Sequence, residues 1–77
     1  MSKYTRDTDS AKNDYIEVEV PSKDESVRVT YVEKGYDGGP CVRIQIHEHG
    51  KQLRMGPEFP VENASQVVAG LIELLTN

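Results

Sequence analysis

Three arginines each fall in a different stretch of alternating polar and apolar residues: Arg28, Arg43 and Arg54. A guanidinium group can bind phosphate through two parallel hydrogen bonds, and it can also stack on the flat face of a base. Gln45 carries an amide able to read base edges, and Lys51 adds a further positive charge. These five residues are our candidate nucleic-acid-binding residues.

Tyr15, together with Tyr31 or Tyr36, could supply the aromatic platforms on which single-strand binders stack bases. A plainer interpretation remains open, because alternating strands always place polar residues outside. Glu17 and Glu19 fall on the same nominal face as the arginines, which favours that plainer interpretation.

Other chemistry is poorly supported. His47 and His49 lie two residues apart, with Cys41 on the same strand face, but a structural metal site needs four ligands and no fourth is evident. No pattern places a nucleophile beside a base. We therefore expect no catalytic residue, no metal, no cofactor and no enzymatic activity.

The candidate residues must be positioned by β-strands, because apolar residues alternate with polar ones around them. Glycine, proline and aspartate separate these stretches, as in turns. The predicted strands span residues 15–20, 27–32, 41–47 and 52–55. They predict a four-stranded antiparallel meander with one apolar face and one polar face that carries the arginines.

One helix is expected, over residues 63–75. Asn63 is a favourable N-cap, and Gln66 is placed to complete a capping box. Apolar residues then recur at helical spacing, and a helix this short requires tertiary packing. The predicted fold is α+β: the meander followed by one C-terminal helix packed on one sheet face.

Residues 1–13 are polar and lack periodicity, so we expect a disordered tail followed by a single ββββα domain over residues 14–77. The net charge is −4, which argues against indiscriminate nucleic-acid binding. One cysteine, no signal-peptide pattern and no long apolar run lead us to expect a cytoplasmic protein without membrane contact.

A helix on a four-stranded sheet leaves apolar surface uncovered, so we expect a homodimer. Its predicted interface comprises Val68, Ile72 and Leu75.

The stretch from Val42 to Leu75 resembles the single-stranded-DNA-binding fold of the transcriptional positive cofactor four and Pur-alpha proteins. The resemblance is carried by Arg54-Met55-Gly56-Pro57-Glu58-Phe59-Pro60, leading into Val67-Val68-x-x-Leu71-Ile72. It implies a dimer that grips nucleic acid with strand residues, here Arg28, Arg43, Lys51 and Arg54. The chain departs from those families in its lack of tryptophan and in its acidic N-terminal segment.

Two functions follow as hypotheses. The first is a small regulatory module, related to transcription, that binds single-stranded DNA or RNA on the open sheet face. The alternative is an acidic protein-interaction module, such as a phage-encoded regulator or inhibitor, whose carboxylates imitate a phosphate backbone when they meet a partner protein.

Overall fold

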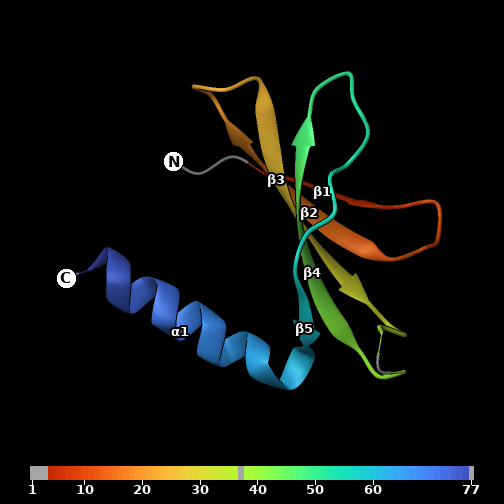
Figure 1. Cartoon of the computed structure of the whole chain (residues 1–77), viewed down its shortest axis with the longest axis vertical. Helices are drawn as coiled ribbons and strands as arrows, with labels where there is room; N and C mark the ends of the chain where they lie inside the picture. The colour runs from red at the N-terminus through yellow and green to blue at the C-terminus, as the bar shows by residue number, and fades with distance from the viewer. Residues whose placement is uncertain (1–3, 37, 77) are drawn as a thin grey trace.

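The computed structural model describes residues 4–36 and 38–76. Five antiparallel strands form one sheet in sequence order, and a C-terminal helix follows it (Figure 1). The strands are β1 (Tyr4–Thr8), β2 (Asp14–Val20), β3 (Glu25–Val32), β4 (Cys41–Glu48) and β5 (Glu58–Pro60). The 3₁₀ turn η1 (Val61–Asn63) leads into helix α1 (Ala64–Leu75). The predicted α+β class is confirmed, but the sheet has five strands instead of four.

The fifth strand lies where the disordered tail was expected. β1 pairs along its whole length with β2, from Tyr4 opposite Val18 to Thr8 opposite Asp14. Its five residues are all exposed, so no apolar alternation marks it in the sequence. Backbone pairing with β2 supplies its order, and the expectation of a disordered tail is wrong for this segment.

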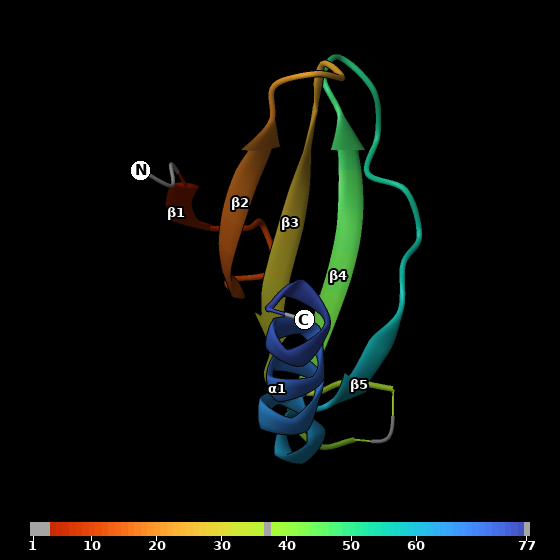
Figure 2. The ribbon, with the colours of Figure 1, turned by 90° about the vertical axis from the view of Figure 1, so that its left-hand side faces the viewer.

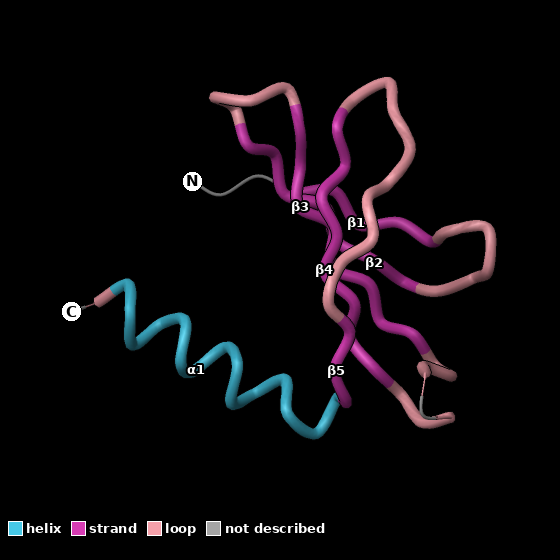
Figure 3. Tube along the Cα trace, viewed as in Figure 1, coloured by secondary structure: helices cyan, strands magenta, loops and turns pink. Residues whose placement is uncertain are grey.

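The strand expected over residues 52–55 is not a regular strand. Figure 3 shows the chain between β4 and β5 as a loop that runs along β4. After the turn bond from Lys51 N to Glu48 O, two isolated backbone hydrogen bonds join it to that strand, from Arg54 N to Ile46 O and from Ile44 N to Pro57 O. On the side of β4 opposite β3, the regular partner is instead the short strand β5, which lies outside the predicted strand ranges.

The register divides the sheet into a polar face and an apolar face. Glu17, Arg28 and Gln45 are direct neighbours across β2, β3 and β4, and the two residues on either side of each in its strand point the opposite way. The apolar face carries valines, isoleucines and a tyrosine from the three long strands: Ile16, Val18, Val20, Val27, Val29, Tyr31, Val42, Ile44 and Ile46.

The most buried residues lie on the polar face. Ser26, Thr30, Val32 and Cys41 are the buried residues of the described chain, and the register places all four there. In Figure 1 the β1–β2 and β3–β4 connections project on the side of the sheet away from α1. By contrast, Val29 and Tyr31 on the apolar face remain 36% and 47% exposed.

Helix α1 does not pack on the sheet, so the expectation of a helix covering one face is wrong within a single chain. None of its residues is buried, and its element neighbour is η1. Figures 1 and 2 show the helix on one side of the sheet, beginning beside β5 and running away from it. The sequence pattern required an apolar partner for α1, and its own sheet does not provide it.

The start of α1 also differs from expectation. Asn63 is its N-cap residue but makes no side-chain capping hydrogen bond. Its Nδ2 instead donates to Gln66 Oε1 at 3.0 Å, so the two side chains contact each other and not the backbone. No helix within the described part of the chain is long and apolar enough to cross a membrane.

Candidate functional site

The centre of the polar face is a cluster built around Glu17 on β2. Its Oε1 accepts from Arg28 Nε at 2.7 Å, and its Oε2 accepts from the Ser26 hydroxyl at 2.6 Å. His47 Nδ1 lies 3.0 Å from the same Oε2. Three strands therefore converge on one carboxylate, because Ser26 and Arg28 project from β3 and His47 from β4.

The Glu17 carboxyl is held ionised by this environment. Burial raises its pKa, but hydrogen bonds from Ser26, His47 and Arg28, with the positive charge of Arg28, outweigh burial. The net result lowers the pKa of Glu17 from 4.5 to about 2. The group is consequently a fixed anion at physiological pH.

Arg28 is held from two directions. Its guanidinium carbon lies 3.9 Å from the centre of the Tyr15 ring, a cation–π distance, while Glu17 binds its Nε. Both members of the Arg28–Glu17 pair are largely buried, with side chains 15% and 16% exposed. The planar guanidinium is therefore fixed over an aromatic ring.

Arg43 is held in a second pair, one strand further along the sheet. Its Nε donates to Glu58 Oε1 at 3.0 Å, and Glu58 Oε2 accepts from the backbone N–H of Tyr36 at 2.8 Å. Arg43 is 35% exposed and Glu58 17%, so the cation is the outer member of this pair. The Glu58 carboxylate therefore links β5 both to Arg43 on β4 and to the loop between β3 and β4.

The five candidate nucleic-acid-binding residues do not all share one face. Arg28, Arg43 and Gln45 project from the polar face. Lys51 lies just after β4, and its Nζ is 3.9 Å from Glu48 Oε2. Arg54 reaches Glu25 and Glu48 at 3.7 Å each, and the register assigns both carboxylates to the apolar face. The expectation that three arginines line one face therefore holds for two of them.

Gln45 is also occupied. Its Nε2 donates to the carbonyl oxygen of Arg54 at 3.2 Å, which fastens the loop after β4 to the sheet. This bond uses one of the two N–H donors of the amide, and the second N–H and Oε1 can still bind a base edge.

His47 and His49 stand at the end of β4 with ring centroids 5.9 Å apart in edge contact. His49 Nδ1 lies 2.9 Å from Asp24 Oδ1, and its Nε2 lies 3.6 Å from Glu19. The hydrogen bond to Asp24 raises the pKa of His49, burial lowers it, and the charges of Glu19, Asp24 and Glu17 raise it further. Among the described residues no group of three or more metal-ligating side chains is assembled.

The predicted interface residues Val68, Ile72 and Leu75 are between 53% and 76% exposed. They lie on α1, which runs away from the strands (Figure 1). The polar cluster and this apolar helix are separate surfaces.

Sequence reasoning missed the carboxylates that hold the arginines. The alternation places Glu17 on the same nominal face as the arginines but does not pair it with Arg28, and it gives Glu58 no role. The signal lies in the pairing: Glu17 is opposite Arg28, and Glu58 is opposite Arg43. Opposite charges at matched positions across a strand pair attract, but the pairing becomes visible only when the register is known.

Comparisons with known proteins identify no relative of this chain. No family model, no curated protein and no solved structure matches the chain. The function must therefore be argued from the site itself.

Proposed function

We propose that this chain is a homodimeric module that binds single-stranded nucleic acid through the polar face of its sheet. The observation that carries this proposal is the fixed guanidinium of Arg28, which lies over the Tyr15 ring and is held by Glu17. An arginine immobilised in this way loses less conformational freedom when it meets a phosphate or a base than a free one does.

Arg43 supports the same proposal. It lies on the same face as Arg28, and Glu58 holds it by Nε from a more buried position. In this pair the cation lies outside and the carboxylate beneath it, which favours an anionic ligand because the ligand meets the Arg43 guanidinium first. A role in transcription rests on the family resemblance alone.

The homodimer is the second part of the proposal. Its support is the exposed apolar surface of α1, where large apolar side chains from Val67 to Leu75 are 45% to 76% exposed. A contiguous exposed apolar surface of this kind marks an interaction site in most proteins.

A protein partner is the second candidate for the polar face. It is favoured by charge compensation, because Arg28 and Arg43, the two arginines of this face, each have a carboxylate within 4 Å. A face on which cations and anions alternate suits a partner with its own mixed charges better than a uniform phosphate backbone.

Titration of fluorescently labelled oligothymidylate and oligouridylate at low salt distinguishes these candidates. We expect micromolar or tighter binding that weakens steeply as salt is raised. The double variant Arg28→Gln, Arg43→Gln should abolish it. The control variant Lys23→Gln, Lys34→Gln removes equal charge from exposed loop positions and should retain most binding.

Absence of binding at low salt would remove the nucleic-acid candidate. Equal losses in the two double variants would show that net charge, and not the polar face, governs binding. Recovery of one stoichiometric protein from nuclease-treated lysate, with no oligonucleotide binding, would favour the protein partner. Light scattering tests the dimer separately, and a monomer mass at micromolar concentration would contradict it.

A further inference from the structure

The apolar surface of α1 is wider than one flat contact requires. Successive residues turn a helix by about 100°, so its apolar side chains span an arc of about 160°. The members of this apolar arc are Ala64, Val67, Val68, Leu71, Ile72, Leu74 and Leu75. Glu73 and Gln66 project from the opposite side. An arc this wide can be covered fully only when apolar surfaces meet the helix from more than one direction.

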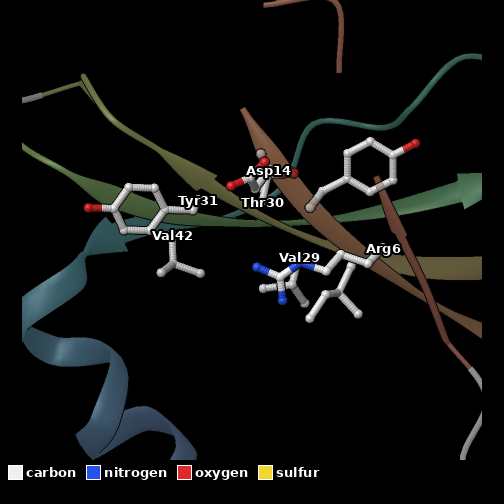
Figure 4. A pocket seen from close by; sticks show the side chains of 8 residues that line it. Arg6, Asp14, Val29, Thr30, Tyr31 and Val42 are labelled. Carbon is white, nitrogen blue, oxygen red and sulfur yellow. The ribbon is translucent and has the colours of Figure 1, made fainter. Parts of the chain in front are cut away.

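The second uncovered surface is the apolar face of the sheet. Val18, Val29 and Tyr31 are 36% to 47% exposed there. Figure 4 shows Val29 and Val42 projecting on the side of the sheet where α1 is also seen. One chain therefore presents an uncovered apolar sheet face and, on the same side of the sheet, a helix whose apolar side chains are uncovered.

The sheet face contains a hollow that suits a helix side chain. Its volume is about 170 Å³, and apolar side chains from β2, β3 and β4 line it, including Ile16, Val29 and Val42. Arg6 of β1 and Asp14 of β2 also line it, and Figure 4 shows the Arg6 guanidinium ending beside Val29. A cavity of about 150 Å³ lined by aliphatic and aromatic side chains can hold a benzene molecule, so this hollow has room for a leucine.

The connection to the helix explains why the helix does not fill the hollow of its own sheet. Pro60 fixes the chain in an extended conformation, with φ −59° and ψ 144°. Three residues of η1 then lead directly into α1, and these two elements contact each other. Helix α1 therefore begins beside β5 and runs away from the strands on one side of the sheet (Figures 1 and 2).

We propose that two copies of the chain exchange their C-terminal helices, so that α1 of each copy lies on the apolar sheet face of the other. This inference rests on the proposed homodimer and specifies its geometry. A two-fold arrangement brings both helices into the space between the two sheets. Each helix then meets the partner's sheet on one flank of the apolar arc and the partner's helix on the other.

This arrangement needs no other partner, because it uses two complementary surfaces of the same chain. The convex helix supplies leucines and valines, and the sheet supplies the hollow and the exposed valines around it. Association removes both apolar surfaces from water in one step. Burial of apolar surface is the dominant favourable term in the free energy of most protein association.

Cross-linking between two differently tagged chains tests the exchange. One chain carries Leu71→Cys on the apolar arc, and the other carries Val29→Cys on the sheet face. The chains are refolded together and oxidised. We expect a disulfide-linked product that contains both tags. The control pair, Glu73→Cys with Val29→Cys, should give little product because Glu73 projects from the opposite side of α1.

The wild-type chain is a second control, because its Cys41 is fully buried. If Val29→Cys prevents folding, the 47% exposed Tyr31 provides the alternative Tyr31→Cys. Disulfides that form only between two Leu71→Cys chains, with none between Leu71→Cys and Val29→Cys, would agree with a homodimer but would contradict the exchange of helices. A chain that carries both Leu71→Cys and Val29→Cys and forms the disulfide within one molecule would also contradict the exchange.

Dissociation gives an independent measurement. Leu71→Asp places a charge in the proposed interface and should weaken the dimer at least about a hundredfold by light scattering or sedimentation. Gln66→Asp introduces the same charge on the opposite side of the helix and should leave the mass unchanged. A dimer insensitive to Leu71→Asp would contradict the exchange, whereas a monomeric wild type would contradict the homodimer itself.

Discussion

Glu17 and Arg28 lie opposite each other on β2 and β3 and form an ion pair of 2.7 Å that is largely withdrawn from solvent. Ser26 and His47 complete the surroundings of the same carboxylate. One acidic residue thereby links three of the five strands. The polar face of this sheet is consequently a structural element as well as a candidate binding surface.

Removing the charge of Glu17 should destabilise the fold. In Glu17→Gln, Arg28 stays in place without an opposite charge, and such a loss typically costs about 2–4 kcal/mol. Urea unfolding measures the difference in the free energy of unfolding. The control is Glu33→Gln, an exposed position just after β3, which should change stability by less than about 0.5 kcal/mol. Equal effects in the two variants would show that the cluster contributes little.

The protein should lose stability in acid because of Glu17. Its pKa is lowered from 4.5 to about 2 in the folded state, so its contribution is fully present above pH 4.5 and is lost as the pH falls through 2. That difference corresponds to roughly 3 kcal/mol. Urea unfolding at pH 6, 4 and 2 should show a smaller decline in Glu17→Gln than in wild type. Parallel declines would contradict this assignment.

His49 should act in the opposite pH range. Its pKa is raised above 6.5, chiefly by the hydrogen bond to Asp24. Its contribution to stability is therefore present below pH 6.5 and is lost as the pH rises through the folded pKa. NMR titration of the imidazole protons should show a raised midpoint in wild type and a lower one in Asp24→Asn. An unchanged midpoint in that variant would rule out Asp24 as the main cause.

Gly56 should be irreplaceable at the contact between the loop and β4. A Cβ atom there would collide with the carbonyl oxygen of Ile44, so Gly56→Ala must push the loop away from the strand. We expect a loss of at least about 2 kcal/mol in the free energy of unfolding.

Gly70→Ala is the matched control, since nothing lies within 4 Å of the position that its Cβ would take. It should raise stability by up to about 1 kcal/mol, because alanine favours a helix more than glycine does. Tolerance of Gly56→Ala would show that the loop does not pack closely against β4.

The alternation of the three long strands could be predicted from the sequence because side chains of a strand alternate strictly between two faces. That rule placed Arg28, Arg43 and Gln45 on one face correctly. It failed for Arg54 because residues 52–55 are not a regular strand. They contact β4 only through isolated hydrogen bonds, so their side chains need not alternate between the two faces. It also missed β1, whose exposed residues carry no apolar signal.

By itself, the sequence determined the helix, the two faces of the long strands and the need of α1 for an apolar partner. All three are local properties of spacing, and spacing is written along the chain. Only the tertiary structure decided that Glu17 and Glu58 hold the arginines and that α1 runs away from its own sheet. Those outcomes depend on the pairing register and on the direction of the three-residue connection η1, and the residue spacing within a single segment determines neither of them.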